Sequence, residues 1–381
     1  MSNPAQNKSK TVWSPLLIIL TAGMCASSTL AAISIKVAGT TFNFKHSMIQ
    51  SFFMNLGEYL NILLFAMPLM TSAKKRHAYF SKLTKEAIAK KQDLKGASLL
   101  SVFPSLVDGI ATGLGTAAIL LLPASIAQML RGGQIISTCI FARIINKRAI
   151  LRHQLVGVII STAGFFVVGL AGYISTNDEG SKKYSIADYM LGILIIIIHL
   201  ALAGLHLNLE ERIMVRYAIS PQRLAGLQGI FGMVLMAAIV SSLAYVPCLN
   251  PQLCNIHGYM EDAILAINDI SKSSGLLCWT LLYIISVAIL NFTAVHVTQL
   301  TSSVFRIFWK TMAVILVWII CVAVGFEKLN PLSSSIQVLG FVMLMISNLT
   351  YNGFLKFRCL GISDNTNDGK KMSITDKYVP L

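Results

Sequence analysis

Long apolar runs dominate this sequence and leave it few folds to adopt. Ten uninterrupted runs of 20 to 25 residues are present, each long enough to cross the ~30 Å hydrocarbon core of a bilayer as an α-helix. They lack the alternation of apolar and polar residues that is typical of membrane β-barrels, so helices are predicted. The runs lie at residues 14–37, 48–72, 97–119, 123–145, 154–173, 187–209, 223–247, 276–297, 303–325 and 333–355.

Charge is scarce and unevenly placed. Only 12% of the residues are charged, about half the fraction that soluble domains carry, which argues against a soluble enzyme. If the N-terminus is cytosolic, 22 of the 31 Lys and Arg residues fall on the cytosolic side and six on the other side. Positive charge collects in cytosolic loops, so we predict cytosolic termini. This topology and contact with the lipid bilayer explain the net charge of +15 without a nucleic-acid partner.

The same order of long and short connections between spans recurs in both halves of the chain. In each half a long loop precedes a tight hairpin between the third and fourth spans. Five spans per half give the halves opposite orientations, which is the inverted-repeat design of secondary transporters, with a site near the midplane. The predicted fold is an all-α membrane protein of ten transmembrane helices in two inverted five-helix repeats. The first half comprises residues 1–173, the second 174–356, and a disordered cytosolic tail 357–381.

Polar residues form stripes on several apolar spans. A charge at the bilayer centre costs ~2.5–3.5 kcal/mol or more, so the stripes are expected to face the bundle interior or a water-filled cavity. The Ser and Thr positions are best explained as interhelical hydrogen bonds. The stripes comprise Ser51, Asn55, Glu58 and Asn61 in the second span, Ser101, Ser105, Asp108, Thr112 and Thr116 in the third, Gln128, Arg131 and Thr138 in the fourth, and Gln299, Ser303, Arg306 and Lys310 in the ninth.

The charged members of these stripes are the candidate site residues. Arg131 and Arg306 would engage anionic groups of a substrate, whereas Glu58 or Asp108 would bind a cationic group or carry a proton. Asp108 could instead pair structurally with Arg131. The predicted substrate-binding residues are Glu58, Asp108, Gln128, Arg131, Arg306 and Lys310, and the proton-coupling candidates are Glu58, Asp108 and His206.

Two residues near His206 on the sixth span have structural interpretations. His199 is expected to bond a neighbouring backbone carbonyl, although proton carriage is an alternative. Glu210 is expected at a solvated cytosolic mouth.

The longest loop on the non-cytosolic side, 248–275, holds two further features. An apolar face between residues 260 and 267 predicts a short helix lying on the membrane surface. Cys248 and Cys254 would form a disulfide in an oxidising lumen, and two free thiols are the equal alternative.

Glycines recur where helices are expected to pack closely. Gly109 and Gly113 lie in the third span, and Gly226, Gly229 and Gly232 in the seventh. Small residues at such spacing let helix backbones approach one another.

Signatures of catalysis are absent from the sequence. It has no GxSxG, HExxH, P-loop or Gly-rich dinucleotide turn, and no CxxC or Cys/His cluster with zinc spacing. The chain is therefore predicted not to be an enzyme and to need no cofactor or metal.

Short motifs recur in order along the chain, and together they resemble a known family. The resemblance covers about residues 14 to 356 and is to the drug/metabolite transporter superfamily, in particular to the F subgroup of solute carrier family 35, related to the chloroquine-resistance transporters. The motifs are Leu56-Gly57-Glu58-Tyr59, Gln128-Met129-Leu130-Arg131-Gly132, Leu209-Glu210-Glu211, Pro221 with Arg223, Glu261-Asp262-Ala263, Arg306 and Tyr351-Asn352-Gly353.

The resemblance implies alternating access and an endosomal or lysosomal membrane, with a mitochondrial or Golgi membrane as the alternative. It supplies no substrate. The Phe-Tyr-Asn-Asn and Gly-Ala-Leu-Asn-Lys signatures of the nucleotide-sugar members are missing here, which argues against a nucleotide sugar. We therefore expect a secondary transporter of a small organic solute. The first alternative is a membrane scaffold that binds another membrane protein, and in a scaffold the residues of the polar stripes should be paired with one another. The next alternative is a channel.

The last four residues, Tyr378-Val379-Pro380-Leu381, match a Tyr-x-x-apolar sorting signal. Clathrin adaptors read such signals as an extended strand that places Tyr378 and Leu381 in two pockets, and Pro380 favours extension of the residue before it. The polar segment 363–377 is expected to be a flexible tether.

Overall fold

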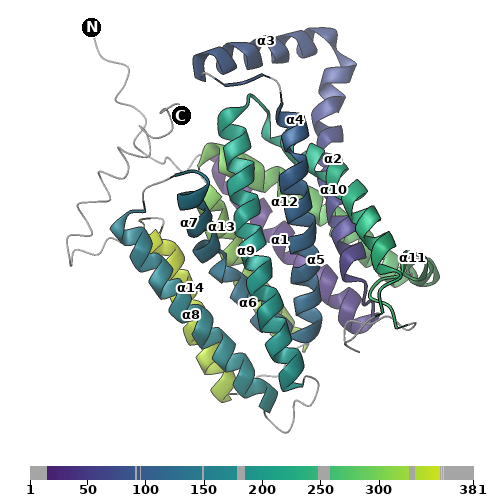
Figure 1. The fold of residues 1–381 in the computed structure, drawn as a ribbon, viewed down its shortest axis with the longest axis vertical. Coiled ribbons are helices and arrows are strands. Elements are labelled where there is room, and N and C mark those ends of the chain that lie inside the picture. Colours follow the sequence, from purple (N-terminus) through teal and green to yellow (C-terminus); the bar gives the residue numbers. More distant parts are fainter. Residues whose placement is uncertain are drawn as a thin grey trace.

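The computed structural model describes residues 15–351 except 91, 95, 148–149, 178–184, 248–257, 302 and 326–330, together with residues 353 and 355. These residues form a bundle of long helices (Figure 1), with no β-structure among them beyond two isolated bridges. The predicted all-α class is confirmed. Eight stretches of the described chain are long and apolar enough to cross a membrane. They lie in α1 (Pro15–Thr41), α4 and α5 (Ala97–Leu100 and Val102–Leu121), α8 (Arg152–Asn177), α9 (Ile186–Arg216), α10 (Pro221–Leu243), α12 (Ser274–Leu300), α13 (Ser303–Ala323) and α14 (Pro331–Tyr351).

The second and fourth predicted spans lie in the same bundle but are not among these eight. The second is α2 (Ser47–Thr71), which has 25 residues and packs against α10, α12 and α5. The fourth is not one continuous α-helix, because α6 (Ala124–Leu130) tightens into the 3-10 turn η1 (Arg131–Gly133) before α7 (Gln134–Ile144). Two consecutive glycines have low helix propensity, which explains the change at this point. The two predicted tight hairpins are present, since two residues separate α5 from α6 and α12 from α13.

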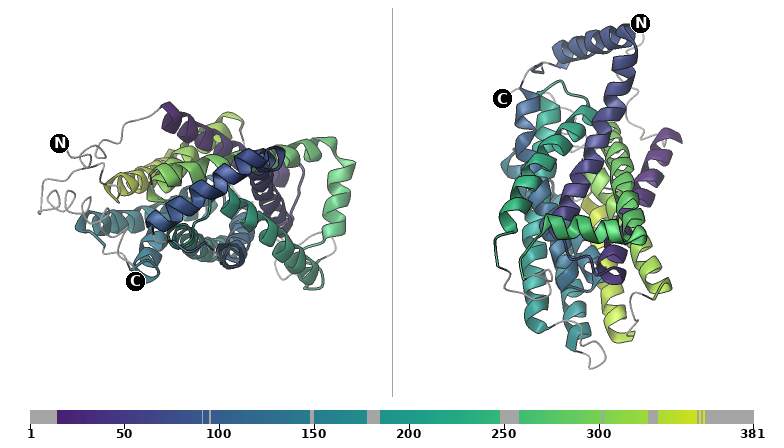
Figure 2. Two further views of the ribbon diagram at one scale, coloured as in Figure 1. Left: turned by 90° about the horizontal axis from the view of Figure 1, so that it is seen from above. Right: turned by 90° about the vertical axis from the view of Figure 1, so that its right-hand side faces the viewer.

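The basic segment between the second and third predicted spans is mostly helical. Its residues Ala73–Lys90 form α3, which crosses one end of the bundle (Figures 1 and 2). The chain after it is fastened to the end of α9, because Asp93 N donates to Arg216 O at 3.0 Å and Ala218 N donates to Asp93 O at 2.9 Å. Ala and Lys are strong helix formers, so this segment has the propensity to be helical as well as basic.

The short helix predicted in the long loop is confirmed as α11 (Ala263–Lys272). The side chain of Asp262 caps it by accepting from the amides of Ile264 and Leu265, each at 3.0 Å. Ile264 is 82% exposed, as a residue that contacts lipid would be. Cys248 and Cys254 lie outside the described residues.

A buried contact between a carboxylate and a histidine ties this region to the start of α2. Glu261 Oε2 lies 3.1 Å from His46 Nδ1, and both side chains are at most 3% exposed. The other oxygen, Oε1, accepts from the amide of Met48. Glu261 therefore satisfies one of the amides that a helix N-terminus leaves without an intrahelical partner, while it fixes the α1–α2 connection to the segment before α11.

Close backbone contact joins α10 to α2. A methyl group added at Gly229 would meet the backbone of Asn55, Glu58 and Tyr59, and one added at Gly232 would meet the side chain of Asn55. The prediction that the glycines of the seventh span allow close packing is confirmed.

Gly229→Ala is expected to destabilise the protein by about 1–3 kcal/mol, since an added methyl overpacks a rigid contact. The matched control is Gly169→Ala in α8, where an added methyl meets nothing within 4 Å. Helix propensity favours alanine at both positions, so the control should be neutral or stabilising. Thermal unfolding of the purified variants measures the difference, and equal midpoints would contradict the packing account.

Candidate functional site

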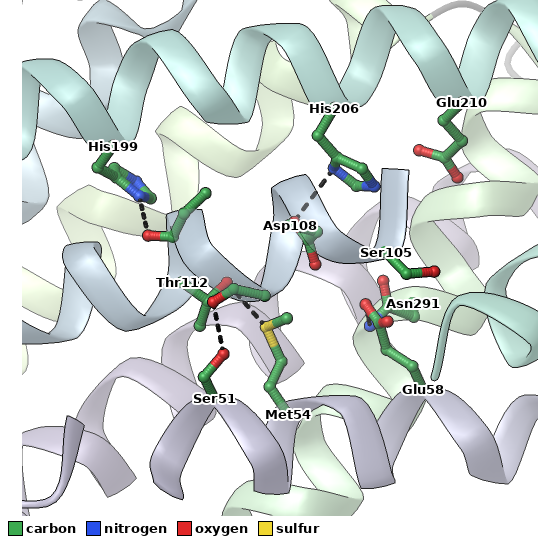
Figure 3. A network of polar contacts seen from close by, with 12 residues as sticks. Ser51, Met54, Glu58, Ser105, Asp108, Thr112, His199, His206, Glu210 and Asn291 are labelled. Atoms are coloured by element: carbon green, nitrogen blue, oxygen red, sulfur yellow. Dashed lines mark hydrogen bonds and ion pairs between the residues drawn. The ribbon is translucent and has the colours of Figure 1, made fainter. Parts of the chain in front are cut away.

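The polar stripes of α2 and α5 meet inside the bundle. Ser51 Oγ donates to Gly109 O at 2.8 Å, and Thr112 Oγ1 donates to Met54 Sδ at 3.1 Å (Figure 3). The interpretation of the Ser and Thr positions as interhelical donors is confirmed for Ser51 and Thr112. It is wrong for four others, because a hydroxyl on a helix can return to a carbonyl of the preceding turn: Ser101, Ser105, Thr116 and Thr138 donate to carbonyls three or four residues earlier. Serine hydroxyls outside the stripes join other helix pairs. They run from Ser137 to Leu200 O, from Ser333 to Ala171 O and from Ser347 to Gly157 O.

A contact between a carboxylate and a histidine links α5 to α9. Asp108 Oδ1 lies 3.1 Å from His206 Nδ1 (Figure 3). The hypothesis that Asp108 pairs with Arg131 is wrong, because Arg131 Nη2 instead donates to Gly115 O, seven residues further along α5. The cause is the packing of the helices, which lays α5 along α9 and so brings His206 to Asp108.

A buried ion pair links α13 to α9. Arg306 Nη1 lies 3.3 Å from Glu210 Oε2, and the two side chains are only 13% and 4% exposed. The expectation of a solvated Glu210 is wrong. The reason is the length of α9, which continues to Arg216 and so places Glu210 well inside the helix end.

Glu58 of α2 is buried and incompletely paired. Its Oε1 accepts from Asn291 Nδ2 of α12 at 3.2 Å. Its Oε2 is buried without a hydrogen-bond partner in the described part of the chain. Asp108, Glu210 and Arg306 act on it electrostatically, so Glu58 belongs to the same cluster as these three residues.

Arg131 lies deeper along the bundle, beside His199. Among the described residues its side chain donates to Gly115 O at 3.0 Å, while its buried Nε has no such partner. The His199 ring lies against the same point of α5. His199 Nδ1 is 2.7 Å from Ala111 O (Figure 3), which confirms that it bonds a backbone carbonyl. Gln128, one turn before Arg131, is buried.

Lys310 has an unusual position on α13. It shares a helix face with three buried residues, Val314, Val317 and Cys321. The opposite face carries the exposed Leu316 and Ile319. Lys310 is nevertheless exposed. It interacts electrostatically with Arg306, Arg131 and Asp108. On the buried face of α13, Lys310 is therefore a residue that its neighbours do not cover.

The structure thus gathers most of the sequence-predicted residues into one network, which we call the central cluster. Sequence reasoning missed Glu210, Asn291 and Tyr283 as members. Glu210 follows His206 by one helical turn, which is the signal that could have included it. Tyr378 and Leu381 lie outside the described residues, and no group of three metal-ligating side chains occurs within the described part. The central cluster comprises Glu58, Asp108, Arg131, His206, Glu210, Tyr283, Asn291, Arg306 and Lys310.

Comparisons with known proteins give several relatives and a shared fold. No protein-family model matches the chain. Solute carrier family 35 member F6 of Rattus norvegicus is 29% identical over 311 residues, which cover 82% of this chain and 79% of the relative. The Homo sapiens protein of that name is 30% identical over 255 residues, or 67% of each chain. An uncharacterized protein of Schizosaccharomyces pombe is 27% identical over 256 residues, which cover 67% of this chain and 74% of that relative. A solved crystal structure shares the fold with a TM-score of 0.52 at 12% identity, over 88% of this chain and 95% of that one.

Proposed function

The chain belongs to the F subgroup of solute carrier family 35, and on this premise we propose that it is a secondary transporter that moves a small organic solute across an intracellular membrane by alternating access. In this proposal the central cluster is the solute site. Membership in this family and the eight apolar helices support a multi-pass membrane transporter.

The proposed topology has ten spans. The eight apolar stretches are joined by α2 and by the α6–η1–α7 unit, both of which lie inside the bundle. The halves 1–173 and 174–356 would be inverted repeats with cytosolic termini, as the Lys and Arg distribution predicts. The basic helix α3 would then lie at the cytosolic surface and α11 at the opposite one.

The observation that carries the proposal is the inward-facing yet exposed Lys310. A scaffold would have its interior charges paired with one another, as Arg306 and Glu210 are, while Asp108 contacts His206. Lys310, Arg131 and Glu58 form no ion pair within the described residues. A buried charge without a partner is costly, so space open to water and solute is the more economical explanation for these three.

The direct test is flux. The purified protein would first be screened by thermal shift against amino acids, peptides, nucleotides and polyamines. Stabilising solutes would then be followed by uptake into proteoliposomes. We expect uptake that saturates with concentration and is accelerated by solute on the opposite side. A protein that moves no solute would support the scaffold, and flux without saturation would support a channel.

Transport is expected to change several-fold when the non-cytosolic side is acidified from pH 7.5 to 5. Protonation of Glu58, Asp108 or His206 would alter the charge of the central cluster, and histidine changes charge in this range. Uptake into proteoliposomes at a series of external pH values measures the effect, with Glu58→Gln and His206→Gln identifying the group. A flat profile in the wild type would contradict proton coupling.

We propose that the protein is located in an endosomal or lysosomal membrane, and that adaptors direct it there by binding the C-terminal tetrapeptide. Tyr378→Ala is then expected to move the protein to the cell surface, because the aromatic ring would fill one adaptor pocket. Imaging of tagged wild type and mutant in cells measures this, with Tyr351→Phe as a tyrosine control at the end of α14. Identical distributions, or a wild type in mitochondria, would show that the tetrapeptide is no sorting signal.

A further inference from the structure

Among the described residues, the pairing within the central cluster leaves two cations and one carboxyl group without an ionic partner. Asp108 is contacted by His206 at 3.1 Å, and Glu210 is paired with Arg306 at 3.3 Å. Within the described residues, no ion pair engages Arg131, Lys310 or Glu58. Of these, Glu58 is 4% exposed and has one oxygen without any hydrogen bond. As far as the described chain goes, the site therefore presents two free cations and one free carboxyl group.

These free charges lie at different levels of the bundle. The guanidinium of Arg131 is bonded at Gly115, whereas Glu58 lies opposite the segment of α5 that carries Ser105 and Asp108 (Figure 3). Seven to ten residues of α-helix separate these levels, or about 10–15 Å along the axis. Lys310 interacts electrostatically with Arg306, Arg131 and Asp108, so it is within electrostatic range of both levels.

We infer that the solute is a small zwitterion that bridges this site, with its anionic group on Lys310 and Arg131 and its cationic group on Glu58. The inference rests on the proposed transporter function and deepens it. A solute with one sign of charge would leave either the free carboxyl or the free cations of the cluster unmatched, and an unmatched buried charge is strongly unfavourable.

The geometry also limits the length of the solute. A hydrogen bond of about 3 Å at each end leaves roughly 4–9 Å between the charged groups of the solute. One residue of extended chain spans only ~3.3–3.6 Å, so a single α-amino acid is short for the site. Short peptides and longer amino acids share the required chemistry, and chain length and amide content distinguish them experimentally.

The test measures how tightly the purified full-length protein binds a series of zwitterions of increasing length. Glycine, 4-aminobutyrate, 6-aminohexanoate and 8-aminooctanoate increase the charge separation stepwise, while hexanoate and hexylamine each carry one charge. We expect the dissociation constant of 4-aminobutyrate or 6-aminohexanoate to be at least ten-fold lower than that of glycine, hexanoate or hexylamine. Diglycine and triglycine then show whether amide bonds add affinity at the same spacing.

Two variants assign the ends of the solute. Lys310→Gln should abolish the preference for 6-aminohexanoate over hexylamine, and Glu58→Gln should abolish the preference over hexanoate. Lys85→Gln on α3 and Asp93→Asn after it remove exposed charges and should leave both preferences unchanged. Thermal midpoints of the unliganded variants verify that each is folded.

The possible results distinguish a failure of the zwitterion inference from a failure of the proposed transporter function. If hexanoate binds as tightly as every zwitterion, or if neither variant changes selectivity, the zwitterion inference is overturned while transport of another solute leaves the proposed function standing. If no solute of any charge crosses proteoliposomes, the proposed function falls and the inference falls with it.

Discussion

Arg306→Met is expected to destabilise the protein by about 3–5 kcal/mol. The substitution keeps an unbranched apolar stem but removes the cation that faces Glu210 at 3.3 Å. Glu210 would then be a buried carboxylate without its partner, and breaking a buried ion pair from one side has this order of cost. Chemical or thermal unfolding of the purified variant, with helix content followed by circular dichroism, gives the change.

The double variant Arg306→Met with Glu210→Gln distinguishes the loss of the ion pair from the loss of other contacts of Arg306. It removes both charges together, so most of the stability should return, because replacing a buried pair by neutral groups is often close to neutral. A double variant as unstable as the single one would show that Arg306 acts through other contacts. A single variant as stable as the wild type would mean that Glu210 is solvated after all.

Arg131→Gln is expected to lower solute uptake at least ten-fold without loss of fold. A hydrogen bond from a charged donor contributes about 1.5–3 kcal/mol, and each 1.4 kcal/mol corresponds to a factor of ten in binding. Glutamine keeps a side-chain N–H donor on a shorter side chain while the charge is lost, and thermal unfolding of the variant checks that the fold is retained. Initial uptake rates into proteoliposomes, normalised to inserted protein, measure the effect.

The control for this variant is Arg143→Gln, which removes an exposed arginine near the end of α7. It should transport like the wild type. Equal uptake by Arg131→Gln and the wild type would remove Arg131 from the solute site. A loss of uptake in both variants would point to net charge rather than to position.

Local patterns in the sequence were sufficient for much of the architecture. The all-α class, the two tight hairpins and α11 each follow from the composition or periodicity of one segment. The stripe containing Ser51 and Glu58 correctly indicated which side of α2 faces inward, because a polar side chain cannot face lipid without large cost. Close contact at Gly229 followed from the spacing of small residues alone.

Pairing within the site could not be predicted in the same way. The partner of Asp108 depends on which helix lies beside α5, and no local pattern specifies that α9 does so rather than the adjacent α6. Glu210 was placed at a solvated mouth because the apolar run ends near residue 209, yet the helix itself continues to Arg216. Helix length and neighbour choice are tertiary properties, so the identity of the free charges required the structure.

The most direct test of the central claim is the accessibility of position 310 from each side of the membrane. A single cysteine would be introduced as Lys310→Cys in a variant lacking the seven native cysteines, and a membrane-impermeant thiol reagent applied from one side at a time. The account predicts labelling from both sides, in proteoliposomes that show no ion conductance, and no labelling of Ala118→Cys, which lies fully buried. Labelling of the Lys310→Cys variant from neither side, or from one side only, would contradict a solute site that opens alternately to both faces.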